Sequence, residues 1–411
     1  MARFTEDDIK SFFVNTPQIT FEVTETCNLN CTYCGYGKYY LADRTNSKKS
    51  LSQEKAITFL NEYIELLSSH YNKYYNRELT IGFYGGEPLV NFELIKNIVN
   101  HIEDSKVPHR IVKYNMTTNG VLLDKYIRFL VEKEFRILIS LDGDEKGNSY
   151  RIDHNGRPSF KKVIENVMRI KAEYPKYFHD NVQFNAVIHN LNSTTRTKSF
   201  IEETFNKTPT MAELNQSGIN PKYYNEFQKM YRSIYEETTS DSIDSKAIVK
   251  PKATDPMFNE LVMYLKLNSP FSYNTYLELL FGKSISSKKT PSGTCLPFSK
   301  KVFITANGDI MACEKISFEN KLGVIAHDKV QLDYQSIAER YNRLFEDLEK
   351  QCKLCSEKES CSQCAFFIPK GARCPAFSSK EIESHQKSKK IKILSDYPEI
   401  YSDIMTNIHV D

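Results

Sequence analysis

Tryptophan is absent from this sequence of 411 residues, and so are long apolar runs. No stretch approaches the ~20 consecutive apolar residues that a bilayer-spanning helix needs. The first residues, MARFTEDDIKSFF, are acidic and lack the apolar core of a signal peptide. The sequence therefore predicts a cytoplasmic protein with no membrane partner.

An excess of one charge sign is also missing. The chain has 55 Lys and Arg against 52 Asp and Glu, a net charge of +3. A nucleic-acid-binding surface normally makes this balance more lopsided, so we expect no nucleic-acid partner. The lysine-rich stretch Lys380–Leu394 is local, and we interpret it as a solvated helical face.

Cysteine is plentiful, with ten residues. In a cytoplasmic protein, disulfides are rare, so metal binding or redox chemistry is the expected use of these thiols. The length and the 40% hydrophobic content allow two domains, or one large domain with an appendage.

Strand-like and helix-like segments alternate up to about residue 215. The helix-like segments repeat apolar residues every three or four positions. The expected strands are Gln18–Thr24, Leu79–Gly85, Ile111–Thr118, Arg136–Asp142, Asn181–His189 and a less regular sixth, Thr208–Leu214. This alternation predicts an α/β fold of parallel βα units, as an open sheet or a partial barrel.

Beyond residue 215 the composition changes. We expect a helical bridging region at 216–290, a small irregular cysteine-rich domain at 291–380 and a tail at 381–411, after an α/β domain at 1–215. The apolar content of 291–380 is thin for a core, so metal should help to hold it together.

The first three cysteines, Cys27, Cys31 and Cys34, directly follow the first strand. In βα architectures this end of a strand is where chemistry is assembled. Soft thiolates favour iron–sulfur or zinc. Three ligands on four irons leave one iron open for a small molecule with an amine and a carboxylate. A zinc knuckle completed by a remote ligand is the alternative.

The spacing of these cysteines, with Tyr33 before the third, resembles the motif of radical S-adenosylmethionine (radical SAM) enzymes. The resemblance implies a partial (β/α)6 TIM-type barrel, a 4Fe-4S cluster and bound S-adenosylmethionine. It also implies reductive cleavage to a 5′-deoxyadenosyl radical that removes a hydrogen atom from the substrate.

The resemblance implies that Tyr33 is a cofactor contact, and further contacts follow from it. The GGEP stretch Gly85, Gly86, Glu87 and Pro88 ends the second strand and would bind the amino group of the methionine moiety. Two glycines allow a ligand to approach the backbone closely. Taken alone, the stretch could equally be a common turn.

The third and fourth strands also end in polar residues. By resemblance, Thr118, Asn119, Ser140 and Asp142 would lie near the ribose or carboxylate of the cofactor. Arg151 matches a family arginine that often pairs with the carboxylate, which suits a guanidinium fork. Each of these residues could instead be a helix N-cap or a turn former.

The other seven cysteines resemble the SPASM extension of radical SAM enzymes, which carries two auxiliary 4Fe-4S clusters. The outer cluster would be bound by Cys352, Cys355, Cys361 and Cys374, and the inner one by Cys295, Cys313 and Cys364. Two residues separate Cys361 from Cys364, where the usual SPASM pattern has three. The inner set also lacks a fourth cysteine, which implies an open iron or another ligand. A zinc ribbon is the alternative.

Glu314 follows Cys313, where sulfatase-maturing relatives carry an aspartate that acts as a base on the substrate radical. A carboxylate here could accept that proton. The alternative is a surface glutamate paired with Lys315 or Lys321.

The predicted function is post-translational modification of a ribosomally made peptide, by a cross-link or thioether-type bond, with a flavodoxin or ferredoxin-type reductant. Anaerobic sulfatase maturation, which oxidises Cys or Ser to formylglycine, is the alternative. About 17 residues precede the first strand, so we expect no separate leader-binding domain. This favours the alternative, or a maturase that recognises its leader in another way. The missing auxiliary cysteine and Glu314 favour the peptide maturase. In a non-catalytic electron carrier the GGEP stretch would have no purpose. A zinc-stabilised interaction module is a further alternative, which metal analysis of anaerobically purified protein would distinguish.

Overall fold

The computed structural model describes residues 3–40, 48–74, 76–216, 218–234, 256–268, 292–326, 328–356, 361, 363–368, 371–378 and 380–407. The chain divides into two compact units. The barrel unit comprises Glu6–Glu237 and Leu296–Ile337. The C-terminal unit comprises Met1–Thr5, Thr238–Cys295 and Ala338–Asp411.

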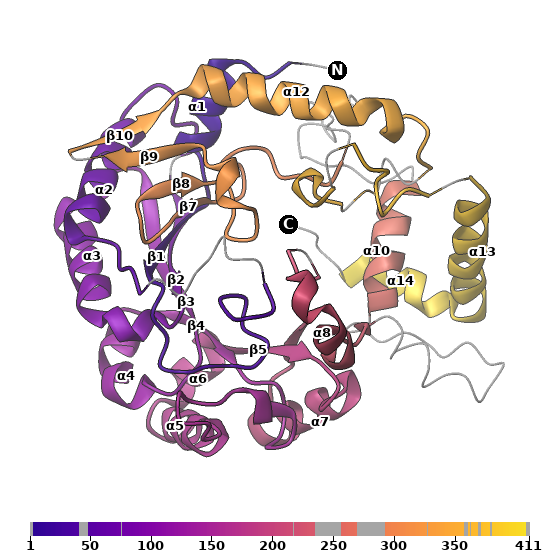
Figure 1. The fold of residues 1–411 in the computed structure, drawn as a ribbon, viewed down its shortest axis with the longest axis horizontal. Helices are drawn as coiled ribbons and strands as arrows, with labels where there is room; N and C mark the ends of the chain where they lie inside the picture. The colour runs from indigo at the N-terminus through magenta and orange to yellow at the C-terminus, as the bar shows by residue number, and fades with distance from the viewer. Residues whose placement is uncertain are drawn as a thin grey trace. The chain divides into compact units, whose positions relative to one another are not determined.

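The barrel unit is built on one twisted sheet, whose first six strands are parallel and follow one another in space as in sequence. They are β1 (Gln18–Thr24), β2 (Arg77–Gly85), β3 (Arg110–Thr118), β4 (Arg136–Ser140), β5 (Val182–Ile188) and β6 (Thr210–Glu213). β6 forms one edge of the sheet, so the barrel is not closed. The expected partial TIM-type barrel is confirmed (Figure 1).

Four shorter strands extend the sheet beyond β1. They are β7 (Val302–Ile304), β8 (Asp309–Met311), β9 (Gly323–Ala326) and β10 (Lys329–Leu332). β7 pairs parallel to β1, and the others follow as an antiparallel meander. The sequence pattern predicts that this segment belongs to the cysteine-rich domain at 291–380, whereas in the structure it is part of the barrel sheet. The expected domain bounds otherwise stay a prediction.

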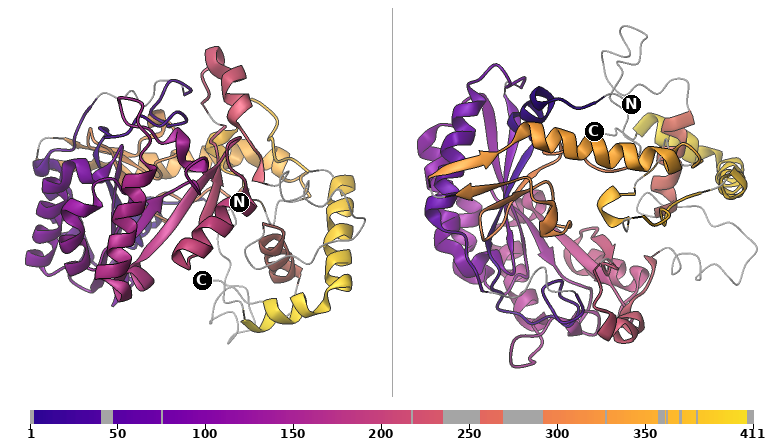
Figure 2. Two further views of the ribbon diagram at one scale, coloured as in Figure 1. Left: turned by 90° about the horizontal axis from the view of Figure 1, so that it is seen from below. Right: turned by 45° about the horizontal axis from the view of Figure 1, so that its top comes forward.

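Helices cover the outer face of the parallel strands (Figures 1 and 2). In chain order they are α1 (Glu6–Val14), α2 (Gln53–Leu67), α3 (Phe92–Ser105), α4 (Leu123–Glu132), α5 (Phe160–Glu173), α6 (Pro175–Asn181) and α7 (Thr194–Phe205). α2 begins where the Ser52 hydroxyl accepts a hydrogen bond from the Lys55 amide, which satisfies one free donor of the first turn.

The strands alternate apolar and polar residues, and this alternation decides what fills the barrel. In β1, Ile19, Phe21 and Val23 are fully buried. Phe21 packs edge-to-face on Phe59 of α2, with ring centroids 6.1 Å apart. Because side chains alternate along a strand, the intervening Thr20 and Glu22 face the interior of the barrel. The interior is therefore lined by polar groups.

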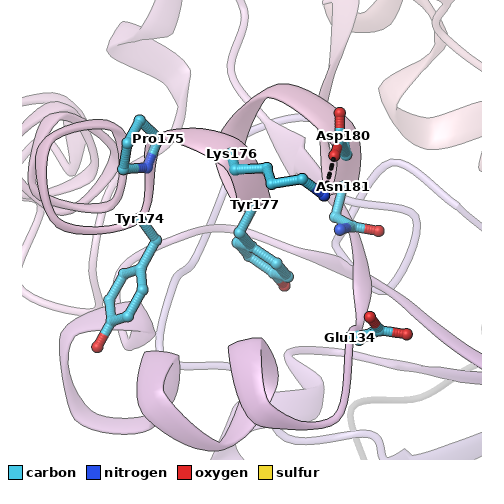
Figure 3. Close-up of a pocket in the computed structure, with 7 residues that line it drawn as sticks. All are labelled: Glu134, Tyr174, Pro175, Lys176, Tyr177, Asp180 and Asn181. Carbon is cyan, nitrogen blue, oxygen red and sulfur yellow. Dashed lines mark hydrogen bonds and ion pairs between the residues drawn. The ribbon is translucent and has the colours of Figure 1, made fainter.

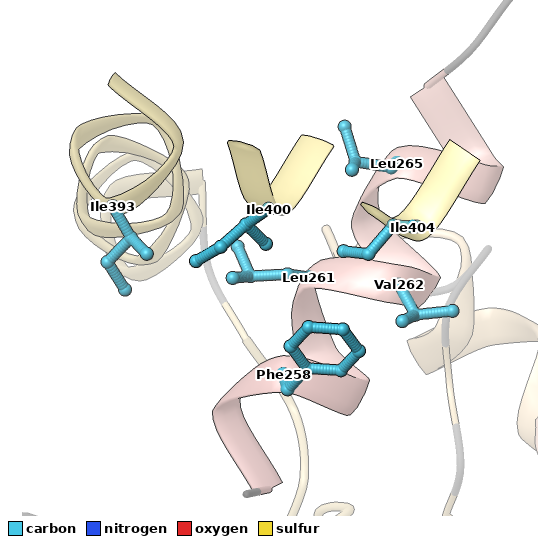
Figure 4. Packing of buried hydrophobic residues seen from close by; sticks show 7 residues of the cluster. All are labelled: Phe258, Leu261, Val262, Leu265, Ile393, Ile400 and Ile404. Atoms are coloured by element: carbon cyan, nitrogen blue, oxygen red, sulfur yellow. The ribbon is translucent and has the colours of Figure 1, made fainter. Parts of the chain in front are cut away.

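The C-terminal unit is mainly helical in its described residues. Its helices are α10 (Pro256–Asn268), most of α12 (Tyr334–Cys352), α13 (Lys380–Asp396) and α14 (Pro398–Asn407). The apolar core in Figure 4 joins α10, α13 and α14 through Phe258, Leu261, Val262, Leu265, Ile393, Ile400 and Ile404. α13 confirms the predicted lysine-rich helix, and its Lys387 and Lys392 are exposed.

The bridging region expected at 216–290 is described only at η4 (Pro221–Tyr223), α8 (Tyr224–Met230), α10 and the residues beside the first two. No helix in the described ranges combines the length and apolar content needed to cross a bilayer.

Candidate active site

The loop that carries the first three cysteines leaves β1 and is fixed to the segment that follows β4. The Asn30 amide donates to the Ile152 carbonyl at 2.7 Å, and the Thr32 amide donates to the Tyr150 carbonyl at 3.0 Å. His154 Nε2 lies 2.9 Å from the Cys27 carbonyl oxygen. Backbone contacts thus fix the cysteine loop at the C-terminal ends of the strands.

The three thiols lie close enough to influence one another. Burial raises the pKa of Cys27 to about 12 and that of Cys31 to about 11, and it also raises the pKa of Cys34. Because burial disfavours the thiolate, a bound cation is needed to hold these ligands deprotonated. A set of three soft sulfur donors fits an iron–sulfur cluster. Within the described residues, no three His, Cys, Asp or Glu side chains are grouped to hold a single metal ion.

The GGEP stretch packs directly against the start of the cysteine loop. The Gly86 amide donates to the Thr24 carbonyl at 2.9 Å. A Cβ at Gly85 would lie 2.1 Å from the Thr24 carbonyl oxygen, and one at Gly86 would lie 2.5 Å from that of Glu25. Gly85 also has a φ of +144°, which disfavours other residues. Glycine is therefore required for the two loops to meet.

The Glu87 side chain turns into the fold. Its carboxylate accepts hydrogen bonds from the Thr118 hydroxyl at 2.8 Å, the Asn119 amide at 2.7 Å and the Leu89 amide at 3.1 Å. Burial raises the pKa of Glu87 to about 7, although these bonds oppose the rise. Pro88 follows, buried in the first turn of η2 (Pro88–Asn91). The side chain of Glu87 thus joins β2 to the end of β3, which leaves the half-buried glycine backbone as the part available to a ligand.

Asn119 connects the end of β3 to the cysteine loop. Its side-chain amide donates to Asn28 Oδ1 at 2.7 Å and lies 3.7 Å from Cys27 Sγ. An amide donor beside a ligand sulfur stabilises a thiolate. Asn119 therefore lies within reach of the expected cluster. Its predicted contact with the ribose or carboxylate of the cofactor stays a prediction.

Asp142, Arg151 and Tyr33 bind one another. Arg151 donates to both carboxylate oxygens of Asp142 at 2.9 Å, and the Tyr33 hydroxyl donates to the same carboxylate. Burial alone would raise the pKa of Asp142, but the Arg151 charge outweighs it and the pKa is about 2. This network ties the cysteine loop to the end of β4. The expected cofactor contacts of these three residues stay predictions.

His189, at the end of β5, was missed by sequence analysis. It is fully buried, and its Nδ1 accepts a hydrogen bond from the Leu191 amide, so the ring proton lies on Nε2. Nε2 lies 3.8 Å from Asp142 Oδ2, and the ring packs against Tyr33 and Tyr150. Its position at a strand end was the available signal. Ser140, which ends β4, is half-buried beside Asn185 of β5.

Glu314 faces a cavity of about 300 Å³ lined by the inner face of the barrel. The cavity wall includes Gln18, Thr20, Tyr84, Asn115, Arg136, Gln183 and Lys301. Glu314 pairs with Lys301, whose Nζ lies 3.1 Å from Oε2. Burial opposes the effect, but the Lys301 charge lowers the pKa of Glu314.

The alternative prediction, that Glu314 is a surface residue paired with Lys315 or Lys321, is wrong, because Glu314 pairs with Lys301. Lys321 pairs with Asp309, and the Glu314 side chain is 18% exposed. Sequence spacing favoured neighbours along the chain, whereas the short β7–β8 hairpin brings Lys301 and Glu314 to the same side of the sheet.

A second cavity, of about 320 Å³, lies around α6 next to the Glu314 cavity, with which it shares Asp180 and Asn181 (Figure 3). Tyr174, Tyr177 and the Lys176–Asp180 ion pair line it. None of the expected site residues belongs to it.

The C-terminal cysteines separate into groups. Cys352, Cys355, Cys361 and Cys374 line one small cavity of about 10 Å³. Burial first, and then the other three sulfurs, raise the pKa of Cys352 to about 11. Cys364 instead has Cys295 as its electrostatic neighbour. Cys313 lies just after β8 in the barrel unit. The four predicted outer ligands therefore meet, while the ligand roles themselves stay predictions.

Comparison with known families identifies the N-terminal part of the chain. Residues 21–193 match the model of the radical SAM superfamily. The match begins in β1 and covers the cysteine loop, the GGEP stretch and the Asp142–Arg151 pair. Residues 21–193 are therefore similar to the domain that defines this superfamily.

Two curated relatives are similar over this region. The radical SAM cyclopropyl synthase TigE of Paramaledivibacter caminithermalis is 26% identical over 176 residues, 41% of this chain and 35% of the relative. A cysteine-type anaerobic sulfatase-maturating enzyme of Clostridium novyi is 31% identical over 157 residues, 37% of this chain and 40% of the relative. The chain thus spans well under half the length of each.

Solved structures resemble a larger part of the chain. Native anSMEcpe with bound AdoMet has a TM-score of 0.57 and 18% identity, over 95% of this chain and all of that one. The same protein with AdoMet and the Kp18Cys peptide has a TM-score of 0.58 and 17% identity. At this identity the likeness establishes the fold.

Proposed function

We propose that this protein is a radical SAM enzyme that modifies a residue of a ribosomally made peptide. The observation that carries the proposal is the meeting of three half-buried cysteines with the GGEP stretch at the C-terminal ends of β1 and β2. A 4Fe-4S cluster bound there would supply the electron that cleaves S-adenosylmethionine to a hydrogen-abstracting radical.

The residues of the chain would position the reactants and exclude water. Asn119 and the Asp142–Arg151–Tyr33 network hold the cysteine loop in place before any ligand binds. The half-buried backbone of Gly85 and Gly86 would meet the amino group of the methionine moiety. Such preorganisation keeps the cofactor and the substrate close at little entropic cost.

The polar interior of the barrel supports a peptide substrate. Amide and hydroxyl groups of Gln18, Thr20 and Asn115 line a cavity of about 300 Å³, large enough for an amino-acid side chain and its backbone. Such groups can bind the donors and acceptors of an extended peptide. Relatives support this choice, since one solved structure of anSMEcpe holds a peptide.

Glu314 is proposed as the proton acceptor for the substrate radical. Its carboxylate lies on the cavity wall and is ionised because Lys301 lowers its pKa. Lys301 would also keep the carboxylate oriented. Two auxiliary 4Fe-4S clusters on the C-terminal cysteines, and a reductant of flavodoxin or ferredoxin type, complete the proposal.

The second candidate is an anaerobic sulfatase-maturing enzyme. Two observations favour it: the likeness in fold to anSMEcpe over 95% of the chain, and the 31% identity to the Clostridium novyi enzyme. Glutamate at position 314, where aspartate is expected in that family, favours the first candidate.

One mass-spectrometric experiment separates the two. Anaerobically reconstituted protein, S-adenosylmethionine and dithionite are mixed with the small peptide encoded beside the gene and, in parallel, with a sulfatase-motif peptide. Loss of a hydrogen pair from the neighbouring peptide alone supports the peptide maturase. Conversion of the sulfatase peptide alone supports the second candidate. If neither peptide changes and no 5′-deoxyadenosine forms, both proposals are wrong.

A further inference from the structure

The segment after β6, residues 218–234, packs over the cysteine loop. The Asn220 amide donates to the Tyr39 carbonyl at 2.8 Å, and the Tyr40 hydroxyl donates to the Asn215 carbonyl at 2.8 Å. Tyr40 and Ile219 form an isolated β-bridge. We call residues 218–234 the loop-covering segment.

Aromatic packing fixes this segment to the loop. Phe227 is fully buried, and its ring centroid lies 6.4 Å from that of Tyr39 and 6.1 Å from that of Tyr40. Tyr223 packs edge-to-face on Tyr39 at 6.0 Å. The outer face of the segment is therefore held in a defined position relative to the cysteines.

That outer face is basic. Lys222, Lys229 and Arg232 are exposed, as is Lys38 on the cysteine loop. Across residues 35–40 and 218–234, Glu226 is the one acidic residue, and Lys38 pairs with it at 2.9 Å. The Glu213 carboxylate of β6 also accepts hydrogen bonds from Tyr231 and Ser233 of the segment. Four basic residues against Glu226 and Glu213 give this patch a charge of +2.

The same patch adjoins an exposed residue next to one of the cysteines. Gly35, next to Cys34, is exposed, and nothing lies within 4 Å of the position a Cβ would take there. Lys38 follows three residues later. The Tyr224 side chain, 51% exposed, adds an aromatic surface to the patch. An electron donor that docks here would lie close to the first cluster.

We propose that the basic surface formed by Lys38, Lys222, Lys229 and Arg232 docks an acidic one-electron donor protein of the flavodoxin or ferredoxin type. This inference rests on the proposed function, because only a redox cluster on the cysteine loop gives the donor a purpose. One electron leaves the reduced donor and enters the cluster, and no bond forms or breaks. Complementary charge speeds such encounters and makes them sensitive to salt.

The test is charge reversal with a matched control. The triple variant Lys222→Glu, Lys229→Glu and Arg232→Glu changes the patch. The control Lys96→Glu, Lys125→Glu and Lys161→Glu makes the same charge change at exposed positions of α3, α4 and α5. Binding of oxidised flavodoxin is measured by biolayer interferometry at low and high ionic strength. Formation of 5′-deoxyadenosine is then measured with reduced flavodoxin and, separately, with dithionite.

We expect the patch variant to raise the flavodoxin Kd and the KM for flavodoxin by about tenfold or more at low salt. Its dithionite-driven rate should equal that of the wild type, and the control should bind flavodoxin normally. The proposal would be wrong if the patch variant and the control variant raised the flavodoxin Kd equally, or if the patch variant left this Kd unchanged. A raised KM for peptide in dithionite reactions would reassign the surface to the substrate. An inactive wild type with dithionite would count against the proposed function alone, because the binding measurement does not depend on activity.

Discussion

The two sets of cysteines are held by different means. Cys27, Cys31 and Cys34 sit on a loop between parallel strands, fixed by backbone hydrogen bonds and buried polar side chains. The outer C-terminal set comprises Cys352, the last residue of α12, and three cysteines on the segments that follow this helix. The first site is therefore preorganised by the fold, whereas the second should depend on the metal that it binds.

Removing one ligand of the first set should have the largest effect. Cys31→Ala should abolish formation of 5′-deoxyadenosine, because a cluster with two cysteine ligands is not retained. The far-UV circular dichroism should stay unchanged, since the loop is fixed by its neighbours. The product is measured by liquid chromatography after anaerobic reconstitution. An active variant would show that the site works without this ligand.

The next largest effect is expected from iron removal, which should change amide hydrogen exchange in one region and not in the other. Chelation should greatly accelerate amide hydrogen exchange in 352–374 and leave exchange in β1 to β5 nearly unchanged, because the parallel sheet holds the first site independently of the metal. The measurement is hydrogen exchange followed by mass spectrometry, with and without reconstituted iron. Equal protection of both regions in the metal-free protein would contradict the comparison.

The buried network behind the first site can be tested directly. Asp142→Asn should destabilise the barrel unit by about 3–5 kcal/mol, because it leaves the buried Arg151 charge uncompensated. Urea unfolding monitored by circular dichroism measures the change.

A matched control is available in the same barrel. Arg136 also binds a carboxylate, Glu78, through two nitrogens at 2.6 and 3.0 Å, but both side chains are 40% exposed or more. Glu78→Gln should cost less than about 1 kcal/mol. A similar cost for the two variants would mean that burial does not set the strength of the Asp142–Arg151 pair.

The smallest expected effect is the loss of folding stability at low pH, where Asp142 becomes protonated. The folded-state pKa of Asp142 is about 2, below its ordinary value of 3.8, so the folded protein binds this proton less readily than the unfolded chain. The resulting stability, on the order of 2 kcal/mol, is present above about pH 4 and is lost as the pH falls through about 2. The stability difference between wild type and Asp142→Asn should therefore narrow over that range. A constant difference would contradict the low pKa.

Strand positions were largely predictable from the sequence, because each parallel strand carries its own alternation. β1 has the expected bounds, and β2, β3 and β5 differ from the expected strands by one or two residues at an end. β4 ends at Ser140, two residues early, because Asp142 turns into the network with Arg151 instead of continuing the ladder.

The meander β7–β10 was not predicted. Its strands are three or four residues long, which is too short for an alternation of apolar and polar residues to be recognised. β7 also pairs with β1, although nearly all of the barrel sequence lies between these two strands. The partner of Glu314 was missed for the same reason, since Lys301 reaches it through that pairing and not through local spacing.

The sequence by itself determined the cysteine triplet, the glycines after β2 and the order of the βα units, because these are local features of spacing and periodicity. The tertiary structure decided that Glu87 faces Thr118, that Tyr33 and Arg151 share Asp142, and that His189 packs beside them. Those contacts join residues as far apart in the sequence as Tyr33 and His189. Only the assembly of the parallel strands brings their side chains together, where burial makes each hydrogen bond and charge matter.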